Sequence, residues 1–349
     1  MTLPRSIVTL VVLALTAACG KGPAPPALRV FVTDETGGFV VVVDPDAGTV
    51  TDRIPVGKRP RGIKVSKDGK QLFVALSGSP IAGPGVDESR LPPPDRSADG
   101  IGMVDLAARK LVKSYPVGED PESFDLSPDG RMLIVSNEDA AAATVLDLST
   151  GTVRGRVKVG SEPEGVTVRP DGKIVYVTSE GDGEIAAIDT ANLNVVAHVA
   201  TAPRPRAIAF TLDGATAFVT CETGGAVTII DAATHKVAGQ IEMPRPEGAP
   251  TPARPMGAVL SPDGRLVFVS LGRAKAVAVI NVASRKVVKT IADVGARPWG
   301  IGVSPDGRKL YTANGPSNDI SVIDIASGTV DRRVTTGGGP WGVAVGTMP

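Results

Sequence analysis

The chain has 349 residues, with 37 Lys and Arg, 37 Asp and Glu, 42% apolar residues and 21% charged residues. This composition is typical of a soluble globular protein and excludes an intrinsically disordered chain. Zero net charge gives no reason to expect a nucleic acid partner, and two histidines are too few for most histidine-based metal or haem sites. We therefore expect no cofactor and no metal.

Residues 1–18 are predicted to be a signal peptide. Arg5 supplies the positive charge, and the apolar stretch that begins at Ile7 is too short to span a membrane. The motif TAAC resembles a bacterial lipobox, which implies cleavage before Cys19, lipidation of that residue and an outer-membrane destination. The alternative is an ordinary signal peptide with an incidental Cys19. Residues 19–28 then form a Pro-rich tether.

Two independent markers repeat along the rest of the chain at about 42-residue intervals. Asp-Gly pairs begin at residues 68, 129, 171, 213, 263 and 306, and a column of Asp or Asn recurs with the same gaps. Each unit reads as four short strands joined by turns, with Asp-Gly suited to a tight hairpin. Such a unit is one blade of a β-propeller.

The number of blades follows from the two incomplete units at the chain ends. Residues 29–57 lack a first strand, and residues 339–346 form a first strand without the rest. Joined, they complete a seventh blade and leave no open edge. We predict an all-β, seven-bladed β-propeller of four-stranded blades over residues 29–346, with its closing blade shared between the N- and C-terminal strands.

The repeat units resemble a known family. Segments such as KIVYVTSEGDGEIAAIDTANLNVVAHV and KLYTANGPSNDISVIDIASGTV look like the YVTN-repeat, or YncE-like, propellers of bacteria and archaea. VGEDPESFDLSPDGR and ANGPSNDISVIDIASGTV resemble, more narrowly, propellers encoded beside PQQ-dependent alcohol oxidation systems. The resemblance covers nearly the whole mature chain and implies an accessory role near quinoprotein oxidation.

Alternating strand direction brings the loop before each first strand and the loop after each second strand to one face, which we call the mouth. Both tryptophans of the chain fall in one column of this face, on neighbouring blades. They are either a ligand-binding surface or packing that plugs the channel. The candidate binding residues at the mouth are Arg61, Glu122, Glu138, Glu164, Glu180, Arg206, Glu222, Trp299 and Trp341.

Acidic and basic side chains occupy different blades of the mouth in the sequence pattern. They predict either salt bridges between adjacent blades or a polarised site for a small polar ligand or a protein loop. A Pro-rich insertion at 77–99 and a longer loop at 243–253 lie on the same face. These two insertions either have no function of their own or form a lid or a docking arm for a partner.

No catalytic motif is convincing. His198 falls in an outermost strand and His235 in a turn on the opposite face, so neither completes a catalytic triad. Cys221 reads as a buried, inert thiol. We assign no catalytic residue, although a carboxylate pair for acid–base chemistry could form among Glu138, Glu164, Glu180 and Glu222.

The sequence thus leaves three functions open. The first is an exported, lipid-anchored, non-catalytic propeller in the periplasm that binds a periplasmic protein or small polar ligand at its mouth. The second is a lactonase-like hydrolase using Arg and Glu residues of the mouth. The third is an envelope scaffold. Enzymatic activity is uncertain, and the scarcity of catalytic motifs weighs against it.

Overall fold

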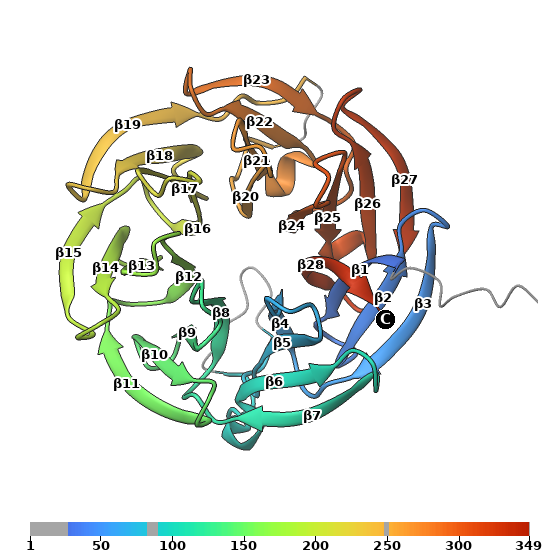
Figure 1. Cartoon of the computed structure of the whole chain (residues 1–349). Helices are drawn as coiled ribbons and strands as arrows, with labels where there is room; N and C mark the ends of the chain where they lie inside the picture. Colours follow the sequence, from blue (N-terminus) through green and yellow to red (C-terminus); the bar gives the residue numbers. More distant parts are fainter. Residues whose placement is uncertain (1–26, 82–89, 248–250, 349) are drawn as a thin grey trace, which may run out of the picture.

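Seven four-stranded antiparallel sheets surround a central axis in the computed structural model, which describes residues 27–81, 90–247 and 251–348 (Figure 1). This confirms the all-β, seven-bladed propeller. The predicted leader, Cys19 and most of the tether lie outside the described residues. No helix within the described ranges is long and apolar enough to cross a membrane.

Blades 1 to 4 each run from an inner strand at the channel to an outer strand at the rim. Blade 1 comprises β28 (Pro340–Met348), β1 (Ala27–Asp34), β2 (Phe39–Asp44) and β3 (Thr49–Pro55). Blade 2 comprises β4 (Pro60–Val65), β5 (Gln71–Leu76), β6 (Gly100–Asp105) and β7 (Lys110–Tyr115). Blade 3 comprises β8 (Pro121–Leu126), β9 (Met132–Asn137), β10 (Ala142–Asp147) and β11 (Thr152–Lys158). Blade 4 comprises β12 (Pro163–Val168), β13 (Ile174–Ser179), β14 (Glu184–Asp189) and β15 (Val195–Ala200).

Blades 5 to 7 follow the same plan. Blade 5 comprises β16 (Pro205–Phe210), β17 (Thr216–Cys221), β18 (Ala226–Asp231) and β19 (Lys236–Glu242). Blade 6 comprises β20 (Ala258–Leu260), β21 (Leu266–Ser270), β22 (Val277–Asn281) and β23 (Lys286–Ile291). Blade 7 comprises β24 (Pro298–Val303), β25 (Lys309–Asn314), β26 (Asp319–Asp324) and β27 (Thr329–Thr335).

The ring closes where the two ends of the chain pair. Strand β28 runs antiparallel to β1, from Pro340 opposite Asp34 at the mouth to Met348 opposite Ala27 at the other end. The chain therefore enters the ring on the face opposite the mouth, which we call the lower face. Closure gives both terminal strands a full set of ladder partners.

The Asp-Gly turns of the lower face form as predicted. In blade 3, Ser127 Oγ donates to Asp129 Oδ1 (2.5 Å) and accepts a hydrogen bond from the N–H of Met132 (2.9 Å), while Gly130 adopts a positive φ of 72°. A residue with a Cβ is disfavoured at that φ, which explains the glycine. The same Ser-x-Asp-Gly arrangement recurs in blade 7 around Ser304 and Asp306.

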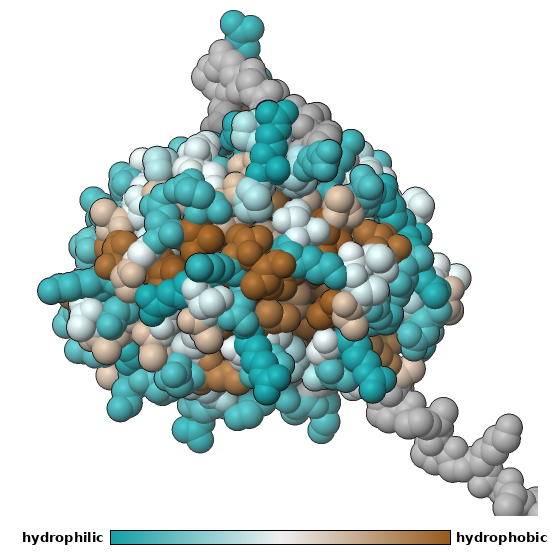
Figure 2. Space-filling model, turned by 90° about the horizontal axis from the view of Figure 1, so that it is seen from above, coloured by the Kyte–Doolittle hydropathy of each residue, from teal (hydrophilic) through white to brown (hydrophobic). Residues whose placement is uncertain are grey.

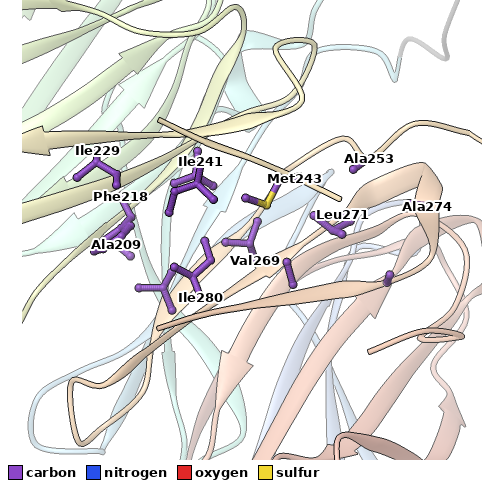
Figure 3. Packing of buried hydrophobic residues seen from close by; sticks show 14 residues of the cluster. Ala209, Phe218, Ile229, Ile241, Met243, Ala253, Val269, Leu271, Ala274 and Ile280 are labelled. Atoms are coloured by element: carbon purple, nitrogen blue, oxygen red, sulfur yellow. The ribbon is translucent and has the colours of Figure 1, made fainter. Parts of the chain in front are cut away.

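The hydrophobic core lies between blades rather than inside any one of them. Figure 3 shows the largest part of it, where Phe218 and Ile229 of blade 5 face Val269 and Ile280 of blade 6. Met243, from the longer loop that follows blade 5, packs into the same cluster. Each blade is thus stabilised by packing against its neighbours. The described part of the ring has no disulfide, and Cys221 is a buried free thiol there.

The insertion after β5 is attached to the mouth by its described ends. It contains the short 3-10 helix η2 (Arg96–Ala98). Arg96 forms an ion pair with Asp139 of blade 3 (2.6 Å), and Lys58 forms one with Asp95 (2.6 Å). The insertion therefore packs over the mouth edge of blades 2 and 3.

Candidate functional site

The residues before the inner-strand prolines have an unusual backbone conformation. Arg59, Asp120, Glu162, Arg204 and Arg297 have φ between 42° and 63°, in the left-handed region, and Gly339 occupies the same place in blade 1. A side chain at positive φ costs roughly 1 kcal/mol or more. Five charged residues keep this conformation at the mouth, where glycine would fit without strain.

A column of hydroxyls fixes the residue after the proline in five of the seven blades. Thr178 of blade 4 accepts a hydrogen bond from the N–H of Gly165 (2.7 Å) and donates to the carbonyl of Arg206 in blade 5 (3.3 Å). Thr33, Ser136, Thr220 and Ser270 make the equivalent bonds to the next blade. The hydroxyls therefore join neighbouring blades and hold the mouth side chains in position.

One half of the mouth is organised around Arg206, which is buried. Its guanidinium lies 2.9 Å from Glu164 and 2.7 Å from Glu222, and it also contacts Glu180. Arg204 forms an ion pair with Glu180 at 2.7 Å. Three buried carboxylates from blades 4 and 5 thus share two arginines.

The other half is organised around Arg61. Arg61 contacts the fully buried Glu122 and lies 3.4 Å from Glu35 and 3.8 Å from Glu138. Arg59 forms a second ion pair with Glu35, at 3.1 Å. The charges that the sequence assigns to separate blades are therefore paired across blade boundaries.

The two tryptophans pack between these two halves of the mouth. Trp299 and Trp341 lie with ring centroids 5.7 Å apart and planes inclined by 35°. Arg61 lies 5.3 Å from the ring centroid of Trp341, and Arg206 lies 4.9 Å from that of Trp299. Arginine over an indole face is a favourable cation–π contact. The indole N–H of Trp341 is buried and has no acceptor among the described residues.

Burial changes the protonation of two of the glutamates. Desolvation, together with the charge of Glu164, raises the pKa of Glu138 to about 7 and that of Glu180 to about 9. Burial also opposes ionisation of Glu222, but Arg206 outweighs it and holds the pKa of Glu222 below its usual value. Neighbouring carboxylates thus favour different protonation states, a condition that acid–base chemistry requires.

Arginines outnumber carboxylates beside Trp299, where Arg204, Arg206 and Arg254 all approach Glu222. Arg297 stacks on Trp299, 4.7 Å from its centroid, and Arg254 lies 3.5 Å from Glu222. Burial, reinforced by the charges of Arg206, Arg273 and Arg204, lowers the pKa of Arg297 despite the opposing effect of Glu222. This side of the mouth therefore favours an anion.

Two cavities adjoin the mouth residues. A central cavity of about 440 Å³ continues from Glu164, Arg206, Trp299 and Trp341 into the channel, where glycines such as Gly300 line it. A smaller one of about 250 Å³ lies between the insertion and blade 3. Its lining includes Leu91, Pro94, Arg59, Asp120 and Glu138.

Carboxylates of Asp120, Glu122 and Glu138 approach one another to within 4.8 Å, a spacing that could hold a metal ion. The sequence predicts no metal site. Arg61 already contacts Glu122 and lies near Glu138, and Arg59 lies 3.6 Å from Asp120, so cations of the protein compensate this cluster.

All nine candidate binding residues of the sequence analysis lie at this mouth. Arg297, Arg254 and Glu35 fall in the same columns of the mouth but are not among these nine, because columns of a repeat show which side chains share a face but not which pairs meet. His198 lies on outer strand β15 beside Glu184, and His235 bonds Tyr176 on the lower face. Cys221 is buried, and burial raises the pKa of its thiol.

Comparison with known families gives two matches. The model of the lactonase family of seven-bladed β-propellers matches residues 158–345, just over half of the chain. The model of the YNCE-like β-propellers matches residues 87–172. Among curated proteins, antigen Lp49 of Leptospira interrogans is 31% identical over 137 residues. That match covers 31% of this chain and 29% of the antigen, so the chain spans less than a third of its relative.

Several solved structures share the fold. The periplasmic gluconolactonase PpgL of Pseudomonas aeruginosa superposes with a TM-score of 0.71 at 21% identity, covering 93% of this chain and 100% of that one. A hydrazine synthase chain of Kuenenia stuttgartiensis gives a TM-score of 0.67 at 23% identity, covering 82% and 89%. A putative 6-phosphogluconolactonase of Bacteroides uniformis gives 0.71 at 16%, covering 91% and 99%. At these identities the likeness concerns the fold alone.

Proposed function

The chain belongs to the lactonase family of seven-bladed β-propellers, and from that premise we propose that its mouth binds a small polyhydroxylated carboxylic acid or the corresponding lactone. The observation that carries this proposal is the group of arginines beside Trp299. Arg297 stacks on the indole in surroundings that lower its own pKa, so a bound anion relieves an unfavourable charge.

The rest of the mouth suits the remainder of such a ligand. The carboxylates of Glu164, Glu180 and Glu222 accept hydrogen bonds from hydroxyl groups, and the half-buried indoles of Trp299 and Trp341 suit the C–H face of a sugar ring. The buried N–H of Trp341 offers a donor that has no acceptor in the described protein. The channel cavity of about 440 Å³, which Glu164, Arg206, Trp299 and Trp341 line at its mouth end, has a volume that suits a molecule of this size.

Binding without turnover is the function we favour, in line with the accessory role implied by the resemblance to propellers of PQQ-dependent oxidation. Oxidation of a cyclic hemiacetal gives a lactone, which hydrolyses to the hydroxy acid. An accessory protein beside such an oxidation meets the ligand class proposed here. We also propose an exported protein anchored through Cys19. Because Ala27 pairs with Met348 on the lower face, such an anchor leaves the mouth open.

Lactone hydrolysis is the second candidate, and Glu138 is the observation that favours it. Its side chain is 34% exposed, its pKa is about 7, and Arg61 lies 3.8 Å away. A base with this pKa can take a proton from a water molecule that attacks the lactone carbonyl carbon. The adjacent arginine stabilises the oxyanion before the ring C–O bond breaks and its oxygen takes up a proton.

Calorimetric titration with D-gluconate and D-glucono-1,5-lactone tests both candidates. We expect Arg297→Met and Trp299→Ala to weaken binding about ten-fold or more, since a charge-assisted hydrogen bond contributes roughly 1.5–3 kcal/mol. Arg308→Met, an exposed arginine of the lower face, is the control. Undiminished binding in Arg297→Met overturns the mouth site. If neither compound binds to the unsubstituted protein, the envelope scaffold is the remaining function.

Hydrolysis is followed separately by titrating the acid released from the lactone. Loss of turnover in Glu138→Gln with retained gluconate binding identifies an enzyme. Release no faster than in buffer, together with gluconate binding, establishes a binding protein.

A further inference from the structure

The outer surface of the ring carries a charge bias that the overall composition conceals. The seven outer strands contain eleven Lys or Arg and three Asp or Glu, in a chain with 37 of each. All eleven basic residues are exposed. Arg53 alone among them has a carboxylate partner within the described part of the chain.

Several rim cations are ordered without being neutralised. Arg332 donates to the carbonyl of Asp46 (2.6 Å), and Arg154 donates to that of Ala191 (3.1 Å). Lys289 donates to the carbonyl of Ser327 in the next blade. A backbone carbonyl orders the side chain and leaves its full positive charge at the surface.

Protection of strand edges explains part of this charge. Every outer strand has one extra residue at the same place, for example Val112 in β7, Ala238 in β19 and Val288 in β23. Such bulges, with charged residues, discourage pairing with another strand. Lysine is the residue most used for that purpose, so we infer an anionic partner only from the sector of the rim where exposed cations line apolar surface.

One sector of the rim combines these cations with apolar surface. Strands β19 and β23 flank a groove of about 710 Å³, which we call the rim groove. Its lining includes Ile241, Met243, Val288, Arg285, Lys286 and Lys289. Val288 is 58% exposed, and Val237 nearby on β19 is 51% exposed. Figure 2 views the ring from the side of β23 and shows an apolar band that crosses the rim between hydrophilic side chains.

We propose that the rim groove binds the surface of a bilayer that contains anionic phospholipid. Arg285, Lys286 and Lys289 contact the phosphate headgroups, while Val288 enters the interface beside them. Lipid fits better than an extended acidic peptide, because the bulges at Ala238 and Val288 interrupt the strand edges to which a peptide would pair. The inference rests on the rim alone and is independent of the mouth.

Vesicle co-sedimentation tests the proposal with a chain that starts at Gly20. Such a chain lacks Cys19 and retains all strands of the ring. We expect it to sediment with vesicles of phosphatidylcholine and phosphatidylglycerol at low salt, and not with phosphatidylcholine alone. Because each cation near an anionic surface contributes to binding, K286E/K289E is expected to lower the partition coefficient at least ten-fold.

Blade 2 supplies a matched control. Lys110 and Lys113 of β7 occupy the positions that Lys286 and Lys289 have in β23, on either side of the same bulge. K110E/K113E is expected to bind within two-fold of the unsubstituted chain, and unchanged melting temperatures exclude misfolding. Equal losses in both variants overturn the assignment to the rim groove. Binding to polyglutamate but not to anionic vesicles overturns lipid as the partner.

Discussion

Arg206 of blade 5 reaches across a blade boundary to Glu164 of blade 4, with Nη1 2.9 Å from Oε2. Both side chains are buried, and the same guanidinium also meets Glu180 and Glu222. This cation therefore holds together three acidic side chains inside the mouth.

Removal of that charge should destabilise the protein strongly. Arg206→Met leaves the carboxylates buried with the less buried Arg204, Arg254 and Arg297 nearby, and loss of one partner of a buried ion pair costs about 3–5 kcal/mol. Guanidinium chloride unfolding measures the effect. Arg265→Met is the control, because that side chain is 82% exposed and should change stability by less than about 0.5 kcal/mol. A loss below about 1 kcal/mol in Arg206→Met would show that the carboxylates do not need this cation.

Glu138 predicts a pH dependence of stability. Its pKa rises from 4.5 to about 7 on folding, so the folded state holds this proton more tightly than the unfolded chain does. The free energy of unfolding therefore falls as pH rises from about 4.5 to 7, and Glu138 adds no further change above that range. Thermal melting of Glu138→Gln should match the unsubstituted protein at pH 4 and exceed it at pH 8. Parallel melting curves across that range would contradict the raised pKa.

The fold was predictable from sequence because each blade repeats its signals. Ser127 with Asp129, and Ser304 with Asp306, mark the same turn, and periodicity fixes which face every strand end joins. The mouth was predictable only as a set of columns. Distances between blades decide that Arg206 pairs with Glu164, Glu180 and Glu222. A sequence column contains one residue per blade and does not give these distances.

The hydroxyl column was overlooked for a different reason. Thr178 and Ser270 look like ordinary strand residues, since threonine and serine are common on a pleated surface. Their role depends on the carbonyl that the next blade presents, at Arg206 and Trp299 respectively. The available signal was a small hydroxyl residue near the end of the second strand in five of the blades, with alanine at this place in the other two.

Loss of one of these hydroxyls should cost more than loss of a methyl group. Thr220 accepts from the N–H of Ala207 (2.9 Å) and donates to the carbonyl of Met256 (2.5 Å). Thr220→Val keeps the shape but leaves both groups buried without a partner, at a cost of about 1–3 kcal/mol. Thr220→Ser retains the hydroxyl and should lose less than about 1 kcal/mol. Chemical denaturation of the two variants gives the comparison, and equal losses would mean that the methyl group matters instead.

Substitutions at a strained residue of the mouth test its effect on stability and its effect on ligand binding separately. Glu162 has φ of 50°, its side chain is exposed, and Gly339 occupies the equivalent place in blade 1. Glu162→Gly removes the left-handed strain but also loosens the unfolded chain, so the net change should lie between zero and about 1 kcal/mol of added stability. Glu162→Val puts a β-branched side chain at the same φ and should cost about 1–2 kcal/mol more than the glycine variant. Unfolding in denaturant ranks the variants, and a valine variant as stable as the glycine variant would mean that no strain is stored there. Because glycine fits each of the six loops with positive φ, a stabilised Glu162→Gly with altered ligand binding would show that the charge is kept for the site.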